Sequence, residues 1–237
     1  MRPIGFSTGA LALADFRRGV SILREKHIRT VELSALRQEE LAPLIESLET
    51  LDLSGFTYVS VHAPSRLDVP NEREAVTLLQ RVLQFQRPII IHPDVMNDLD
   101  LWKRFGSLLL VENMDKRKPI GRTASELASI FRELPNASFC FDLGHARQVD
   151  PTMSEATLIL EKHASRLIQL HVSDVNTRST HERLTEGAIN AFSRISHLIP
   201  EEVPVILETP VSIDEIEPEI ARTRRALSQV ASAVAGD

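Results

Sequence analysis

The stretch Leu108-Leu109-Leu110-Val111-Glu112 joins an uninterrupted apolar run to a carboxylate at its end. A short apolar run without alternation is typical of a strand that is covered on both faces, as in a parallel sheet. Further runs of this kind occur along the chain, and most are followed by a longer segment with helical periodicity. We expect eight strands, at residues 4–7, 30–33, 58–61, 89–91, 108–111, 138–141, 167–170 and 203–207.

The segments between these strands have apolar residues at helical spacing. We expect helices at residues 15–27, 38–51, 72–86, 123–134, 154–163 and 188–199, and a shorter one near 97–105. Thr123 and Glu126 form a capping-box pattern at the start of one of them. Eight β/α units without a linker predict one α/β domain over residues 1–237, a single (β/α)8 TIM barrel. A doubly wound open sheet is the alternative, although no glycine-rich phosphate fingerprint follows the first strand.

The composition narrows the class of protein. The 237 residues are 43% hydrophobic, and 27 basic against 33 acidic residues give a net charge of −6, which provides no global attraction for nucleic acid or anionic lipid. No apolar run approaches the roughly 20 residues that span a bilayer, so we expect no membrane partner, and we interpret the opening residues as a strand rather than a signal peptide. Cys140 is the single cysteine, which favours a cytoplasmic compartment and a packing role in an apolar run.

Seven of the eight predicted strands end in a carboxylate or an imidazole. In a TIM barrel the carboxyl ends of the strands meet at one mouth, where catalytic residues lie. Carboxylates packed there repel one another unless cations or protons compensate, so their mixture with imidazoles predicts a divalent metal site. Ordinary solvated strand ends explain any one position, but not all seven together. The residues are Glu32, His62, His92, Glu112, Asp142, His171 and Glu208.

The remaining histidines divide into two groups. His27, His163 and His197 fall near the ends of predicted helices, where an imidazole interacts favourably with the helix dipole. His145 follows Asp142 by three residues, and His181 lies in the loop after the seventh strand. We therefore assign the first three to structure and expect His145 and His181 at the site.

The strand-end motifs, taken in order, resemble those of the xylose isomerase-like barrel superfamily. This superfamily includes sugar-phosphate isomerases, ketose 3-epimerases and endonuclease IV. Each motif is weak alone, but their order extends over almost the whole chain. The motifs are His62-Ala63-Pro64, His92-Pro93, Glu112-Asn113-Met114, Asp142-Leu143-Gly144-His145, His171-Val172-Ser173-Asp174 and Glu208-Thr209-Pro210.

The epimerase branch of this resemblance implies one ion held by Glu112, Asp142, His171 and Glu208. Three oxygens and one nitrogen suit Mn2+, Mg2+, Co2+ or Zn2+. Glu112 and Glu208 would act as the catalytic acid and base through an enediolate, and His145 would orient a substrate hydroxyl or a ligand. Our first expectation is therefore a metal-dependent isomerase or epimerase whose partner is a small carbohydrate, a sugar or sugar phosphate.

The alternative is a zinc phosphodiesterase of the endonuclease IV kind that acts on abasic DNA, and nucleic acid is a partner only in this reading. It implies a zinc ion on His62, His92 and Glu112, and a second on the four residues given above. A third would bind His145, His181 and an Asp two residues before His181, a position that holds Ser179 here, with Asp174 as a replacement. Another metal-dependent reaction on the same barrel, or metal binding without catalysis, are further alternatives.

Other polar residues near the predicted mouth are candidates for binding substrate. Lys116 and Arg117 belong to a basic run after the fifth strand that suits a phosphate, with a solvated loop as the alternative. Arg178 resembles the arginine that some epimerases place on a substrate oxygen. We also expect Glu32 and Asp174 to contact substrate. No feature specifies an oligomeric state.

Overall fold

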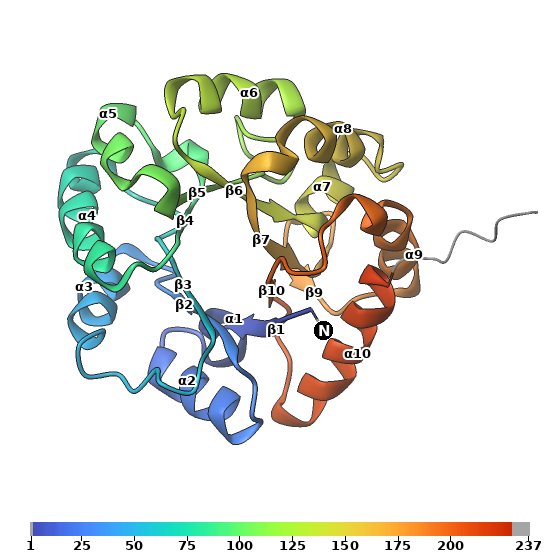
Figure 1. Ribbon diagram of the computed structural model, residues 1–237, viewed down its shortest axis with the longest axis horizontal. Coiled ribbons are helices and arrows are strands. Elements are labelled where there is room, and N and C mark those ends of the chain that lie inside the picture. The colour runs from blue at the N-terminus through green and yellow to red at the C-terminus, as the bar shows by residue number, and fades with distance from the viewer. Residues whose placement is uncertain (1, 229–237) are drawn as a thin grey trace, which may run out of the picture.

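Eight parallel strands form a closed barrel in the computed structural model of the protein, which describes residues 2–228 (Figure 1). Their order around the barrel is β1-β10-β7-β6-β5-β4-β3-β2, so the first strand pairs with both the second and the last. The single (β/α)8 TIM barrel predicted from the sequence is confirmed, and the open sheet is wrong. The barrel strands are β1 (Ile4–Ser7), β2 (Thr30–Ser34), β3 (Tyr58–His62), β4 (Ile89–Ile91), β5 (Leu109–Glu112), β6 (Ser138–Asp142), β7 (Leu167–Val172) and β10 (Val205–Leu207).

Helices surround the barrel on its outside (Figure 1). Within residues 2–228, none is both long and apolar enough to cross a membrane. The α-helices are α1 (Thr8–Ala12), α2 (Phe16–Glu25), α3 (Gln38–Ser47), α4 (Glu72–Leu79), α5 (Leu99–Trp102), α6 (Ala124–Glu133), α7 (Leu143–Val149), α8 (Ser154–His163), α9 (Glu186–Ile195) and α10 (Ile216–Leu227). The 3-10 helices are η1 (Val69–Asn71), η2 (Gln80–Phe85), η3 (Pro93–Val95), η4 (Lys103–Leu108), η5 (Ala164–Arg166), η6 (Ser196–Leu198) and η7 (Ile213–Glu215).

Every helix expected from the sequence is present, with ends that differ by a few residues. The segment predicted as one helix over 72–86 divides into α4 and η2, and the short helix near 97–105 divides into α5 and η4. Three helices, α1, α7 and α10, were not predicted from the sequence. A small antiparallel hairpin after β7 was not predicted either; it is made of β8 (Asp174–Val175) and β9 (His181–Glu182).

Side chains at two helix starts explain where those helices begin. The Thr123 hydroxyl accepts a hydrogen bond from the Glu126 amide and starts α6, as predicted. The second half of the expected capping box is wrong, because the Glu126 carboxylate accepts from the backbone and the guanidinium of Arg122, at 2.7 and 2.8 Å. Asp142 starts α7, since its Oδ1 accepts from the His145 amide at 2.6 Å.

Inward-facing positions of the strands recur with a period of two. Ile90, Leu110 and Cys140 form a separate buried cluster, and each lies two residues before a polar group at or just past the end of its strand. These side chains therefore fill the barrel below its mouth, while the larger core lies outside this cluster. Burial raises the pKa of the Cys140 thiol, in agreement with the predicted packing role.

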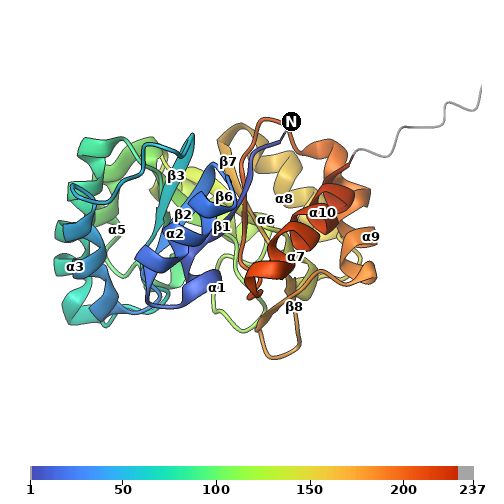
Figure 2. The same cartoon turned by 90° about the horizontal axis from the view of Figure 1, so that it is seen from below.

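The β8–β9 hairpin projects from the barrel at the end opposite the N-terminus (Figure 2). It is held to the loop between β5 and α6, because the Ser179 hydroxyl donates to Asp115 Oδ1 at 2.9 Å. It is also held to α7, because Arg147 Nη1 donates to Asp174 Oδ1 at 2.5 Å. The hairpin thus carries His181 over the carboxyl ends of the barrel strands.

Candidate metal centre

Four side chains from successive strand ends meet at the barrel mouth. Glu112 ends β5, Asp142 ends β6, His171 lies near the end of β7, and Glu208 follows β10 directly. One ligand atom from each residue lies within 4.8 Å of those from the other three. The strand register contributes to this, since Asp142 pairs with His171 across β6 and β7. The structure thus places together the four residues that the resemblance implied, as one group that we call the four-ligand group.

Each residue of the four-ligand group has a buried polar atom without a hydrogen-bond partner among residues 2–228. A buried polar atom without a partner is costly, and four of them in one place call for a common partner. A divalent cation would supply it, and three carboxylate oxygens with one imidazole nitrogen suit Mn2+, Mg2+, Co2+ or Zn2+. The atoms are Glu112 Oε1, Asp142 Oδ2, His171 Nδ1 and Glu208 Oε2.

Backbone carbonyls determine which nitrogen of two histidines remains available. His62 Nδ1 lies 2.6 Å from the Ala63 carbonyl oxygen, and His145 Nδ1 lies 2.9 Å from that of Asn113. A carbonyl oxygen only accepts, so each Nδ1 donates its proton, and in the neutral ring Nε2 is the nitrogen that carries the lone pair. This is how outer contacts prepare an imidazole to bind a metal.

Glu32 performs the same task for His171. The His171 Nε2 donates to Glu32 Oε2 at 2.9 Å, which leaves Nδ1 free in the four-ligand group. Glu32 is fully buried, and its Oε2 also accepts from the Gln169 amide at 2.7 Å. It lies behind His171 and is not among the residues that line the cavity at the mouth, so contact of Glu32 with substrate stays a prediction.

Asn113 joins β5 to β6 at the mouth. Its Nδ2 donates to the Asp142 carbonyl at 2.9 Å, its Oδ1 accepts from the Asp142 amide at 2.7 Å, and its own carbonyl accepts from His145. One buried residue therefore fixes both Asp142 and His145. Asn113 belongs to the Glu112-Asn113-Met114 motif, but this role was not predicted from the sequence.

Three further groups that could hold an ion share residues with the first or with one another. Glu112 and Asp142 each belong to two of the four groups, and so do His62, His171 and Glu208. The Glu112 Oε2 lies 3.2 Å from His62 Nε2 and 3.3 Å from His92 Nε2, while its Oε1 lies 3.2 Å from His171 Nδ1. The additional groups are His62, His92 and Glu112, and Asp142, His145 and His181; His62, His171 and Glu208 form a further combination of the same residues.

The group around His181 differs from the one that the resemblance implied. Ser179 is not part of it, because its hydroxyl donates to Asp115. Asp142 supplies the carboxylate instead. Asp115 was missed by the sequence analysis, although it follows the Glu112-Asn113-Met114 motif directly and lines the cavity.

Asp174 has a structural role. Its Oδ1 accepts from Arg147 Nη1 at 2.5 Å, and its Oδ2 accepts from the Thr185 hydroxyl at 2.6 Å. Both oxygens are engaged in this way, and Asp174 belongs to none of the four ligand groups and is not among the residues that line the cavity. Its expected contact with substrate stays a prediction.

Burial and charge oppose each other in this cluster. Burial alone would raise the pKa of Glu112, but the imidazoles around it, His171 foremost, hold that pKa well below its usual range. Burial raises the pKa of Glu208 to about 8 against the effect of His171. Burial disfavours the charged forms of His62 and His145, yet the neighbouring carboxylates raise their pKa values to about 9 and about 10. Protons thus balance the carboxylates here, a role that a bound cation would take over.

A cavity of about 410 Å³ opens over the ligand groups. Its wall includes the cationic side chains of Arg66, Arg117 and Lys118, and six of the candidate ligands: His62, His92, Glu112, His145, His181 and Glu208. Lys116 and Arg178 are exposed and do not line it, so Arg117 is the one cationic residue predicted to bind substrate that does. Arg66 was missed, and its only signal was a position four residues after the end of β3.

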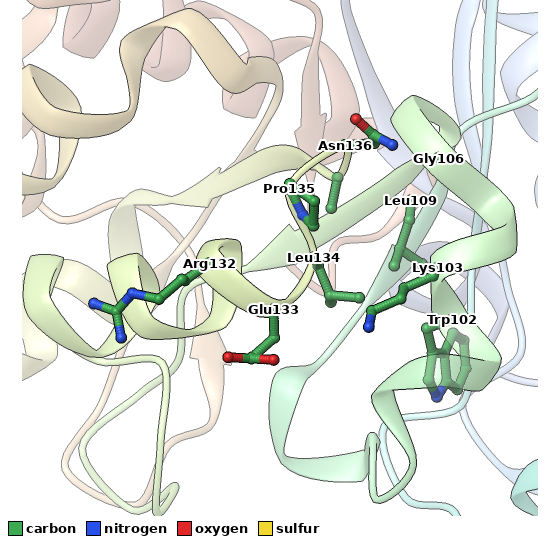
Figure 3. A pocket seen from close by; sticks show the side chains of 10 residues that line it. Trp102, Lys103, Gly106, Leu109, Arg132, Glu133, Leu134, Pro135 and Asn136 are labelled. Carbon is green, nitrogen blue, oxygen red and sulfur yellow. The ribbon is translucent and has the colours of Figure 1, made fainter.

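A second cavity, of about 320 Å³, lies at the other end of the barrel. Figure 3 shows the side chains of Trp102, Lys103 and Leu109 on one side of it, and those of Glu133 and Leu134 at the end of α6. Leu109 begins β5 while Glu112 ends it, so this cavity lies at the amino ends of the strands. That end of a TIM barrel usually serves stability rather than catalysis.

The comparisons with known proteins agree with this architecture. The sequence profile of the xylose isomerase-like TIM barrel family matches residues 34–230. No curated protein is significantly similar to the chain in sequence. Endonuclease IV from Thermus thermophilus is similar in structure, with a TM-score of 0.62 at 17% identity, over 96% of this chain and 99% of that one.

Two further structures are similar over the same extent. The 3-keto-D-glucoside 4-epimerase YcjR from E. coli has a TM-score of 0.63 at 11% identity, over 94% of this chain and 99% of that one. A xylose isomerase domain protein from Alicyclobacillus acidocaldarius subsp. acidocaldarius has a TM-score of 0.63 at 12% identity, over 96% and 98%. At these identities the likeness shows the fold alone.

Proposed function

Because the chain belongs to the xylose isomerase-like TIM barrel family, we propose that it is an enzyme that uses divalent metal ions at the barrel mouth to hydrolyse a phosphate ester. The observation that carries this proposal is the position of Glu112, whose carboxylate is shared by two ligand groups. A shared carboxylate suits two ions held side by side, an arrangement common in enzymes that cleave phosphate esters. The fold itself is compatible with this chemistry and does not select it, because an endonuclease IV and a sugar epimerase are about equally similar in structure.

Divalent ions at these groups would polarise a phosphoryl oxygen and make water a stronger nucleophile. The chain itself holds the ligands in place and admits substrate from one side. Glu32 and Asn113 orient the imidazoles of His171 and His145 from behind. Glu208 is 16% exposed and borders the cavity, so substrate approaches the centre past this carboxylate.

The second candidate is a metal-dependent isomerase or epimerase of a sugar or sugar phosphate, and Glu208 favours it. Its carboxylate is 16% exposed and borders the cavity, where it can reach a proton of the substrate. The expected partner in that transfer, Glu112, is fully buried and has imidazoles at both oxygens, which makes it a poor proton carrier. This candidate therefore ranks second.

Metal content and two substrate panels separate the candidates. The full chain is reconstituted with Zn2+ or Mn2+, and the metal bound per chain is measured by mass spectrometry. Two or three ions with turnover of bis(4-nitrophenyl) phosphate or an abasic-site duplex support the hydrolase. One ion with turnover of ketoses or their phosphates supports the isomerase, and no bound metal contradicts both.

The variant His92→Ala tests the hydrolase directly. His92 belongs to the group with His62 and Glu112 but not to the four-ligand group. Phosphoester turnover should fall by at least about 10- to 100-fold, the loss typical when even a residue that only orients a metal ligand is removed, whereas isomerase turnover should stay nearly unchanged. His197→Ala, on the exposed side of η6, is the matched control. Hydrolysis that persists in His92→Ala would contradict the shared-ion arrangement.

A further inference from the structure

Positive charge gathers in the cavity wall beside the ligand groups. Arg66 comes from the loop after β3, and Arg117 and Lys118 come from the loop after β5. Lys118 is neutralised, because its Nζ lies 2.7 Å from Asp94 Oδ2. The guanidinium groups of Arg66 and Arg117 have no ion pair or hydrogen bond to any residue in the described range 2–228.

The nearest acidic residue in sequence does not neutralise Arg117. The Oδ1 of Asp115 accepts from the Arg117 backbone amide at 2.7 Å and from the Ser179 hydroxyl at 2.9 Å. Asp115 is buried and serves to join the β5–α6 loop to the β8–β9 hairpin. Both guanidinium groups therefore line the cavity without an ion pair or hydrogen bond among residues 2–228.

We infer that Arg66 and Arg117 bind an anionic group of the substrate, of the phosphate class, next to the metal ligands. The guanidinium group matches the oxygens of a phosphate with two parallel hydrogen bonds. Ions in the adjacent ligand groups would add positive charge to the same cavity and so favour an anion further.

This inference rests on the proposed function in one respect, because that function puts the reacting bond of the substrate at the ligand groups. In a hydrolase the bound group is a second phosphate beside the one that reacts. In an isomerase it is the phosphate of a sugar phosphate. In both, the arginines hold a part of the substrate that does not react.

The test is calorimetric titration of inorganic phosphate into the metal-reconstituted full chain. Arg66→Gln and Arg117→Gln should each weaken phosphate binding about tenfold, as for loss of a charge-assisted hydrogen bond, and the double variant should weaken it further. Metal content is measured in the same samples, so that affinities are compared at equal loading. Phosphate held by the ions alone would bind the double variant as tightly as the wild type, and that result would overturn the inference.

Two variants with the same loss of charge control the experiment. Lys116→Gln alters the residue next to Arg117 but outside the cavity wall, and Arg104→Gln alters an exposed residue of η4, in the segment that borders the second cavity. Both should bind phosphate like the wild type. If Lys116→Gln weakens binding as much as Arg117→Gln, general attraction by the loop explains the effect and the inference is wrong.

The same data keep this inference separate from the proposed function. Phosphate binding that depends on the two arginines, in a protein that hydrolyses no phosphate ester, removes the hydrolase and leaves the anion site. Wild-type phosphate affinity in the double variant, together with intact hydrolysis, removes the anion site and leaves the hydrolase.

Discussion

Glu32 acts on the candidate metal centre without facing it. Its carboxylate accepts from His171 Nε2 and so makes Nδ1 a better ligand. In Glu32→Gln the negative charge is lost while the volume is kept, and metal affinity should fall about 10- to 100-fold. Competition with a chromophoric chelator measures the metal affinity of each variant. Glu46→Gln, an exposed carboxylate on α3, should leave the affinity unchanged, and an equal affinity in both variants would remove Glu32 from this role.

The role of Glu32 also shows where residue-level prediction ends. The sequence marks Glu32 and His171 as polar ends of apolar strands, and this pattern is enough to place both at the mouth. Their contact joins residues 139 positions apart and depends on the barrel being closed. Nothing in the local sequence distinguishes a carboxylate that orients a metal ligand from one that binds substrate, so Glu32 was assigned to substrate. The four-ligand group, by contrast, was named from the motifs alone.

Protonation of the metal-free cluster predicts an unusual dependence of stability on pH. The pKa values of Glu208, His62 and His145, about 8, 9 and 10, lie above their ordinary values of 4.5 and 6.5. A raised pKa means that the folded state binds the proton more tightly than the unfolded state does, which adds to the free energy of unfolding. This contribution is complete at pH values below the ordinary pKa and is lost as the pH rises through the pKa of the folded state. The pKa of His181 is lowered to about 4, and this reduces the stability of the folded state only below pH 6.5.

The metal-free protein should therefore become less stable between pH 6.5 and pH 9, a range over which His62 loses its whole contribution, His145 most of its own and Glu208 the last part of its own. Metal-loaded protein should lose less stability, because the ions replace the protons. Thermal unfolding of chelator-treated and reconstituted samples at both pH values measures the difference. A melting temperature of the chelated protein that rises over this range would contradict the proton-sharing cluster.

The β8–β9 hairpin is the element that completes the group around His181. Asp174 of β8 holds it in place, because its carboxylate accepts from Arg147 of α7 and from Thr185, which directly precedes α9. Asp174→Ala leaves a partly buried guanidinium unpaired and should cost about 1–3 kcal/mol. The hairpin should then loosen, and the metal bound per chain should fall by one ion while the four-ligand group stays filled.

The control for this variant is Glu182→Gln, a change on the exposed side of the same hairpin. Metal counting by mass spectrometry and circular dichroism are run on both proteins. Full metal content in Asp174→Ala, with the fold intact, would show that the hairpin does not position His181.

At the scale of elements, the apolar runs predicted all eight barrel strands, because strands covered on both faces carry that signal themselves. The segment Asp142-Leu143-Gly144-His145 was harder, since it ends β6 and begins α7 without a loop between them. A Cβ atom at Gly144 would lie 2.7 Å from the Ser173 carbonyl oxygen, so α7 packs directly against the chain after β7. Such a close approach depends on tertiary structure. A segment of seven residues is also only about two helical turns long, which is too short for its apolar periodicity to indicate a helix.

At the scale of the whole molecule, closure of the barrel turns scattered residues into one site. Pairing of β1 with β10 completes the ring, and without it the ends of β3 and β10 would lie at different places along an open sheet. The strand count is the same for both arrangements, which is why sequence alone left the open sheet as an alternative. The deciding interactions are contacts between distant segments, and Gly5 makes the tightest of them among the described glycines.

Gly5 lies on β1, where the neighbouring strand β2 approaches most closely. A Cβ atom there would lie 1.8 Å from the Thr30 carbonyl oxygen, a backbone atom that cannot move aside without breaking the barrel. Gly5→Ala should therefore destabilise the protein by about 3 kcal/mol or more and reduce metal binding at every group together. Gly55→Ala is the matched control, because no atom lies within 4 Å of its added Cβ, and it should be neutral or slightly stabilising. Chemical denaturation measures both, and equal stability of the two variants would show that β1 does not need glycine to close the barrel.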